Sequence, residues 1–417
     1  MRAAMQNKRN DLEKRASLFP DGVYLGLLML AYVIVGINTY RLQPVLTTLM
    51  DYLSADTSRI GFLMSLCTFV TLCLAIPFGV TLPRLGCRRA MILAVFLEIA
   101  GSVIGFLFPT YGGIAVSQIL FGLTNTMATV CAPYLLQMVY DKKEFSVTVG
   151  YLNACQTVGM AAAFLILPLL LAGNAVPQVW FFTVIPSGLL LLTWIPAMNR
   201  GAELALQQRA DARQQEGVSA REKEEGEGKK GDLSLKKTET WLAAVSTFFI
   251  MFSAGAVLNF ASSFLTAVRG IPEGTAARIV LSSAVVGMVC SAFVGIVCNQ
   301  AGRRIVFIAI VIILALLRLL MVVTPTGILL NLVIALQGVP AAGIVVINTL
   351  VPDLCPSVKQ RPLVISMIST ASMAGMCLSS IVFGMMIRWW GYDRAFLVMV
   401  PVSLLALVGV RSVVSDR

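Results

Sequence analysis

Histidine is absent from this chain of 417 residues, and Asp and Glu together number only 21. No two carboxylates share one of its long apolar stretches, and its nine cysteines form no Cys-x-x-Cys pair. Acid–base catalysis and metal catalysis therefore lack the groups that they need. The chain also has no Walker-type phosphate loop, so we do not expect it to hydrolyse ATP. These absences predict a protein that is no enzyme and holds no cofactor and no metal.

Charge is scarce as well. Only 13% of the residues are charged, whereas 58% are hydrophobic and the mean hydropathy is +0.84. A soluble domain has about 45–50% apolar and about 25% charged residues. A soluble fold of this length has no way to hide so much apolar surface. The excess has to face lipid, which predicts an integral, multi-pass membrane protein whose main partner is the bilayer.

The apolar residues gather in twelve runs, each near the roughly 20 residues that a helix needs to cross a bilayer. Polarity does not alternate along them, so they predict helices rather than the strands of a barrel. The expected fold class is all-α integral membrane, with twelve transmembrane helices. The runs cover residues 22–50, 58–80, 90–109, 111–137, 146–171, 177–196, 240–268, 276–298, 304–323, 326–351, 361–387 and 394–412.

The formal net charge of +11 is distributed unevenly. Most Lys and Arg residues fall in loops on one side of the predicted helices, together with both ends of the chain. The positive-inside rule therefore places both termini in the cytoplasm, with the protein in the cell (inner) membrane. The basic residues form no aromatic-studded patch, so nucleic acid is not an expected partner.

A charged segment separates two halves. Residues 199–239 carry nine basic and nine acidic residues, a mixture too polar to fold alone. We interpret the chain as a cytoplasmic N-terminal segment (1–21), a six-helix bundle (22–198), a cytoplasmic linker (199–239) and a second six-helix bundle (240–417). A membrane sensor or scaffold that uses the linker as its output is the alternative outside transport.

The second half repeats the first. Residues 36–47 read GINTYRLQPVLT and residues 255–266 read GAVLNFASSFLT, an offset of 219 that also relates Gln118 to Gln337. Repeated halves are typical of transporters, whose binding sites lie near mid-membrane at the repeat interface. The repeat predicts two pseudo-symmetric bundles.

Two short motifs carry a family resemblance. Residues 79–89 read GVTLPRLGCRR and residues 295–304 read GIVCNQAGRR, each between two apolar runs. They resemble the signature of the major facilitator superfamily, roughly G-x-L-x-D-R-x-G-R-R. The acidic residue of that signature is replaced by Pro83 and Asn299, so the latch built on it is missing or differently built. The residues that match are Gly79, Arg84, Gly86, Arg88, Arg89, Gly295, Gly302, Arg303 and Arg304.

The resemblance implies a monomeric secondary transporter that works by alternating access, with the matched residues in a cytoplasmic gating motif. It also implies that the first, fourth, seventh and tenth helices line a central cavity. Further along, Gly391 lies where the family usually breaks between helices eleven and twelve.

Three charged residues fall inside the apolar runs. Arg41 lies in the first run, and a guanidinium there suits a carboxylate or another oxyanion, or else reaches the outer headgroups. The surrounding Tyr40–Pro44 weakly resembles the first-helix Arg of the cyanate and nitroimidazole permease branch. Glu98 is expected to be a neutral carboxyl bonded to a neighbouring helix, with proton coupling as the alternative. Arg318 lies about 10 Å from the outer break at Pro325, so it can snorkel, and we interpret it as a structural residue.

Uncharged polar residues recur at helical spacing on the four runs that the resemblance assigns to the cavity. Hydrogen bonding between helices explains any single Asn or Gln as well. Together with Arg41, the residues that we predict to bind substrate are Asn38, Gln118, Asn125, Thr129, Asn259, Gln337 and Asn348.

These residues favour a small organic anion as the substrate of a secondary active transporter. Export of drugs or other small molecules is the alternative within transport, but the fifth run lacks a Gly-Pro pair of the kind found in drug antiporters. Exchange of one anion for another and proton coupling through Glu98 both remain possible sources of energy.

Overall fold

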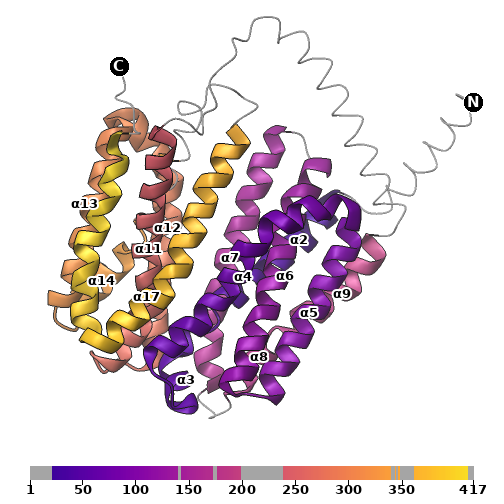
Figure 1. The fold of residues 1–417 in the computed structure, drawn as a ribbon, viewed down its shortest axis with the longest axis horizontal. Helices are drawn as coiled ribbons and strands as arrows, with labels where there is room; N and C mark the ends of the chain where they lie inside the picture. Colours follow the sequence, from indigo (N-terminus) through magenta and orange to yellow (C-terminus); the bar gives the residue numbers. More distant parts are fainter. Residues whose placement is uncertain are drawn as a thin grey trace, which may run out of the picture. The chain divides into compact units, whose positions relative to one another are not determined.

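The computed structural model describes residues 21–139, 142–171, 176–198, 238–339, 343, 346–347 and 361–411, and every regular element in them is a helix (Figure 1). The helices are α2 (Asp21–Tyr40), η1 (Gln43–Val45), α3 (Leu46–Leu53), α4 (Thr57–Leu85), α5 (Cys87–Leu107), α6 (Tyr111–Val139), α7 (Lys142–Leu171), α8 (Gln178–Phe181), α9 (Val184–Ala197), α11 (Thr238–Ala267), α12 (Glu273–Ala301), α13 (Arg303–Val323), α14 (Ile328–Leu336), α17 (Arg361–Leu404) and η4 (Leu405–Arg411).

Ten helical stretches among the described residues are long and apolar enough to cross a membrane. One of them, Met367–Val408, has 42 residues and bends at Gly391, so it accounts for two of the predicted runs. Of the run expected at 326–351, α14 is described, and most residues beyond 339 lie outside the described part. The stretches therefore agree with the predicted all-α membrane fold.

In both copies of the repeated motif a glycine separates two helices. Gly86 separates α4 from α5 with φ 81° and ψ 147°, and Gly302 separates α12 from α13 with φ 83° and ψ 138°. A side chain with a Cβ rarely adopts this conformation, so both positions require glycine. The two motif copies thus make the same backbone turn, which confirms the internal repeat at the level of local structure.

Contacts within the chain define two compact units. Unit 1 comprises Met1–Thr39, Cys73–Ala162 and Pro177–Lys230, and unit 2 comprises Tyr40–Leu72, Ala163–Val176 and Gly231–Arg417. In unit 2, the segment that follows α2 and the first half of α4 therefore pack with helices from the second half of the sequence. The predicted linker lies outside the described residues up to residue 237.

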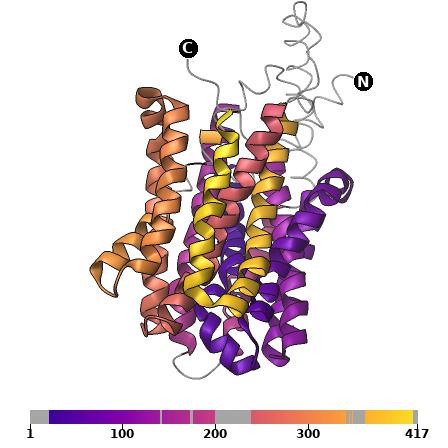
Figure 2. The same ribbon diagram turned by 60° about the vertical axis from the view of Figure 1, so that its left-hand side comes forward.

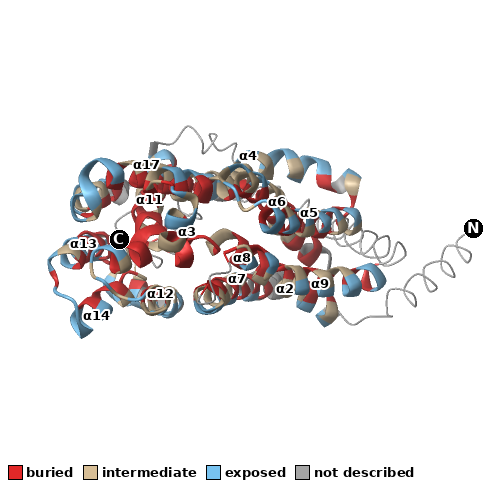
Figure 3. Cartoon of the chain, turned by 90° about the horizontal axis from the view of Figure 1, so that it is seen from below, coloured by how far each residue is buried: buried red, intermediate tan, exposed pale blue. Residues whose placement is uncertain are grey.

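Each unit has its own apolar core. In unit 1, α5 packs along α6, and residues of α2 such as Leu28 join the core with Trp194 of α9. In unit 2, α11 lies beside α17 (Figure 2) and is coloured mostly as buried in Figure 3. Phe260, Phe264 and Phe396 are fully buried aromatic residues between these two helices.

Large apolar side chains also cover the outside of the helices. A water-soluble protein does not expose so many, whereas lipid tails are their natural surroundings. The pattern agrees with a multi-pass membrane protein. The most exposed examples include Ile76, Val80, Leu169, Ile185 and Leu192.

Candidate functional site

A hydrogen-bonded cluster of amides and a carboxyl lies inside unit 1. Asn38 of α2 donates from Nδ2 to Glu98 Oε2 on α5 at 2.7 Å, and the same nitrogen lies 3.5 Å from Asn125 Oδ1 on α6. Asn125 Nδ2 in turn donates to Thr39 Oγ1 at 3.2 Å. Asn38, Glu98 and Asn125 are all buried. Three residues that the sequence singled out on separate helices are therefore in contact.

Glu98 also borders a small cavity of about 10 Å³. Ser187 of α9 and Thr124 of α6 line it too, and the rest of its wall is mostly apolar. Ser187 is fully buried, and its hydroxyl has no hydrogen-bond partner among the described residues. The cavity is about as large as one water molecule requires. The Glu98 carboxyl thus lies between the Asn38 amide and a cavity with room for one water molecule.

The other two predicted residues of unit 1 lie on α6. Thr129 is half-buried, and its hydroxyl donates to the carbonyl oxygen of Asn125 at 2.6 Å, one turn earlier. Gln118 is buried, and its side-chain oxygen accepts no hydrogen bond from a described residue. The side-chain oxygen of Gln118 can therefore accept a hydrogen bond from a ligand, whereas the hydroxyl of Thr129 is bonded to its own helix.

Helix α2, which carries Asn38, runs very close to α7. A methyl group at Gly36 would collide with the carbonyl oxygen of Gln156, and one at Gly159 would collide with the carbonyl oxygen of Val33. Small residues allow this approach of two backbones, which is common between membrane helices. The contact fixes the rotation of α2 and hence the direction in which Asn38 points.

Arg41 belongs to unit 2 and lies directly after the end of α2. Its side chain is completely buried (0% exposed), which shows that it does not reach the surface. Two residues later, Gln43 donates from Nε2 to Asn259 Oδ1 on α11 at 3.0 Å. Asn259 Nδ2 donates to Ser380 Oγ on α17 at 2.7 Å. The segment around Arg41 is therefore tied to a predicted substrate residue of the second half.

Further polar contacts hold the same end of unit 2 together. Glu273, the first residue of α12, accepts a hydrogen bond from the backbone N–H of Thr47 at 3.2 Å and a short one from the hydroxyl of Thr48. It thereby caps the first turn of α3, where free N–H groups and the helix dipole favour an anion. These bonds connect residues more than two hundred positions apart in the sequence.

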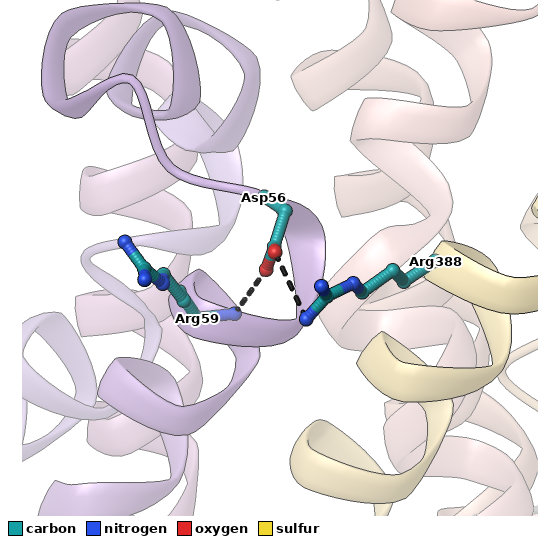
Figure 4. Close-up of polar contacts among 3 residues, drawn as sticks. All are labelled: Asp56, Arg59 and Arg388. Atoms are coloured by element: carbon teal, nitrogen blue, oxygen red, sulfur yellow. Dashed lines mark hydrogen bonds and ion pairs between the residues drawn. The ribbon is translucent and has the colours of Figure 1, made fainter.

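Asp56 makes a related link (Figure 4). One carboxylate oxygen accepts from the backbone N–H of Arg59 at 2.9 Å in the first turn of α4, and the other lies 3.2 Å from Nη1 of Arg388 on α17. Because the Arg388 side chain is 57% exposed, solvent screens this ion pair and it adds little stability.

Arg318 differs from its sequence prediction in one respect. It is fully buried and does not snorkel, because α13 turns it toward α11 and the end of α14. Nε donates to Ser253 Oγ at 3.1 Å, Nη2 donates to the Ser253 carbonyl at 2.9 Å, and Nη1 donates to Gln337 Oε1 in a short bond. Gln337, predicted to bind substrate, also donates to the Leu317 carbonyl at 3.0 Å.

The remaining predicted residues are placed as follows. Asn348 lies outside the described residues. In the two motif copies the side chains of Arg84, Arg89 and Arg304 are exposed, whereas those of Arg88 and Arg303 are half-buried. Exposure beside the helix breaks is compatible with a gating role but does not test it, so the gating role stays a prediction.

Three contributors were missed by the sequence reasoning: Gln43, Ser253 and Glu273. Gln43 does lie within the repeated segment 36–47, which was a usable signal. Ser253 is one of many serines in the apolar runs, and Glu273 resembles an ordinary loop charge. Nothing local in the sequence distinguishes either of them.

Comparison with known proteins gives a family. Residues 28–298 and, in a second match, residues 243–416 fit the family model described as Major Facilitator Superfamily. Together the two matches span nearly the whole chain. A search of curated protein sequences gave no match.

Solved structures resemble the fold throughout. The crystal structure of the nucleoside transporter NupG superposes with a TM-score of 0.72 at 13% identity, over 94% of this chain and 98% of that one. A bacterial homologue of the human lysosomal transporter Spinster, inward-facing and occupied, gives 0.67 at 14% identity, over 93% of this chain and 95% of that one. At such identities the likeness concerns the fold alone.

Proposed function

Because the chain belongs to the major facilitator superfamily and is a multi-pass membrane transporter, we propose that it moves a small organic anion by alternating access. The observation that carries this proposal is the complete burial of Arg41 at the end of α2. A charge inside a membrane segment is costly, and residues of this kind usually serve a transport pathway.

The guanidinium of Arg41 suits an acidic group for geometric reasons. It is planar and offers a fixed fork of N–H donors that matches both oxygens of a carboxylate. Gln43 and Asn259, which are bonded to each other close by, supply neutral donors and acceptors for the rest of a small molecule. We keep Asn38, Gln118, Asn125 and Thr129 in the proposal as the neutral residues predicted from the sequence.

Alternating access requires contacts that form in one state and break in the other. We propose the contacts of Glu273 with α3 and of Asp56 with Arg388 for this role, because they bind the segment after α2 to helices of the second half. The protein would act as a monomer in the inner membrane with both termini in the cytoplasm.

Two energy sources fit this proposal, proton coupling and anion exchange. Glu98 can take up a proton and is hydrogen-bonded to Asn38, which the sequence predicts to bind substrate, so proton coupling has a physical basis. Exchange of one anion for another needs no titratable group. The variant Glu98→Gln distinguishes the two mechanisms. If transport is coupled to a proton on Glu98, the variant should lose uphill accumulation of substrate and keep exchange. If the protein is an anion exchanger, the variant should keep both activities.

A nucleoside is the second candidate substrate. The buried amides Asn38 and Asn125 are of a kind that hydrogen-bonds neutral polar molecules, and one similar structure is named a nucleoside transporter. Export of cationic drugs has less support, because the fifth apolar run lacks the Gly-Pro pair of drug antiporters.

The test measures binding of small carboxylates, nucleosides and cationic dyes to the purified chain by thermal shift, since a ligand that binds the folded state raises its melting temperature. Arg41→Ala should weaken carboxylate binding about 30-fold or more, because losing one partner of a buried charge pair costs about 2–5 kcal/mol. Arg41→Lys should restore only part of the affinity.

Arg278→Ala is the matched control. Arg278 is exposed on α12, and its hydrogen bonds to described residues stay within that helix, so its removal should leave binding unchanged. If Arg41→Ala binds the carboxylate as tightly as the parent, or if only nucleosides bind to the parent, the anion proposal is wrong.

A further inference from the structure

Arg318 is the second fully buried arginine of unit 2, and all of its hydrogen-bond partners among the described residues are neutral. They are the hydroxyl and carbonyl of Ser253 and the side-chain oxygen of Gln337. Neutral groups solvate a guanidinium but do not cancel its charge. A buried charge without a counter-charge is strongly destabilising.

The described residues of unit 2 offer no buried carboxylate that would balance this charge. Their acidic side chains are exposed or half-buried, and the two that are half-buried already bind elsewhere, Asp56 to Arg388 and Glu273 to α3. Among the described residues of unit 2, the charge of Arg318 is therefore not balanced, and an anion from outside the chain would balance it. The described acidic residues of unit 2 are Asp51, Asp56, Glu239, Glu273 and Asp393.

The guanidinium also retains unused donors. It has five N–H groups, and the three bonds to Ser253 and Gln337 occupy three of them. The two that remain belong to the two terminal nitrogens. An oxyanion accepts from such a pair better than any neutral group does. Ser253 and Gln337 meanwhile hold the guanidinium in one orientation, which lowers the entropic cost of binding.

Arg318 and Arg41 are attached to the same helix. Arg318 bonds to Ser253 on α11, and the segment of Arg41 bonds through Gln43 to Asn259, six residues further along α11. Six residues of helix span roughly 9 Å. The side chain of Arg318 also contacts Gln337, so it reaches between α11 and the end of α14, which both carry predicted substrate residues.

We propose that Arg318 binds a second acidic group and that the transported anion is a dicarboxylate or a similar molecule with two acidic groups. This inference rests on the proposed function, in which Arg41 binds the first group. Gln337 then acts as a positioning residue that orients Arg318 and has no direct contact with the substrate.

The experiment compares matched pairs of probes on the purified full chain. Each dicarboxylate, from oxalate to glutarate, is paired with the monocarboxylate of the same chain length, and affinities are measured by thermal shift at constant salt. The parent should prefer the best dicarboxylate over its partner at least tenfold. Arg318→Gln should abolish this preference by weakening the dicarboxylate alone, whereas Arg41→Gln should weaken both. Arg278→Gln serves as the control that changes neither affinity.

Chemical protection of the parent protein covers the case in which Arg318→Gln does not fold. The dicarboxylate, but not the monocarboxylate, should protect Arg318 from phenylglyoxal, as read by peptide mass spectrometry. Equal modification with both probes, or an unchanged preference in folded Arg318→Gln, overturns the inference and leaves the anion proposal intact. Absence of binding by every acid tested would instead overturn the proposed function itself.

Discussion

The hydrogen bond between Asn38 and Glu98 allows the clearest quantitative prediction about the interior of unit 1. The change is a double-mutant cycle made of Asn38→Ala, Glu98→Ala and the double variant. The cycle isolates the interaction between the two side chains from the other effects of each substitution. The measurement is the free energy of unfolding in detergent micelles during titration with a denaturing detergent.

The expected coupling energy follows from the geometry. Hydrogen bonds between helices of membrane proteins average about 0.6 kcal/mol and reach about 1.7 kcal/mol. The distance between Asn38 Nδ2 and Glu98 Oε2 is 2.7 Å, at the short end for N–H···O bonds, and both residues are buried. We therefore expect the upper part of that range, about 1–1.7 kcal/mol.

Asn125 supplies an internal control. Asn38 Nδ2 lies 3.5 Å from Asn125 Oδ1, so the same cycle with Asn125→Ala should give a coupling of about 0.5 kcal/mol or less. A coupling between Asn38 and Glu98 that is zero, or smaller than that between Asn38 and Asn125, would refute the arrangement of the cluster.

Gly36→Val should lower the melting temperature strongly, because overpacking costs about 1–3 kcal/mol and the obstructing atom is a backbone oxygen. Gly26→Val on the same helix should have little effect, because no atom lies within 4 Å of the added Cβ. Equal effects of the two valines would argue against the close approach. Arg388→Ala should change the free energy of unfolding by no more than about 1 kcal/mol, as for other exposed ion pairs. The variant should alter the transport rate if the contact with Asp56 takes part in gating. A decrease of several kcal/mol in the free energy of unfolding would contradict the exposure of this ion pair. A cytoplasm-active reporter should work at Gly228 and be silent at Gly274, and the reverse pattern would overturn the orientation.

Local patterns in the sequence account for some features of the backbone. The repeated motif placed glycine at residues 86 and 302, and both have the backbone conformation that only glycine adopts readily. Helical spacing likewise placed Asn38 and Asn125 on faces that meet. These features depend on a few neighbouring residues, which is why the sequence reveals them.

Contacts between distant segments could not be predicted from the sequence. Hydropathy gives the depth of Arg318 along its helix but not the rotation of that helix, so the expectation that its side chain can snorkel was wrong. The contact between Glu98 and Asn38 depends on which helices are neighbours, and that follows from close packing at positions such as Gly36. The cap that Glu273 places on α3 joins residues from opposite halves of the chain.

The central claim, transport of a small organic anion through Arg41, is tested most directly by counterflow in proteoliposomes. Vesicles that contain the parent protein are loaded with an unlabelled carboxylate and given a trace of the labelled compound outside. We predict rapid accumulation of label with the parent, with Arg278→Ala as the unaffected control, and none with folded Arg41→Ala. Counterflow of a nucleoside or a cationic dye in the absence of any carboxylate exchange, or undiminished carboxylate counterflow in Arg41→Ala, would contradict the claim.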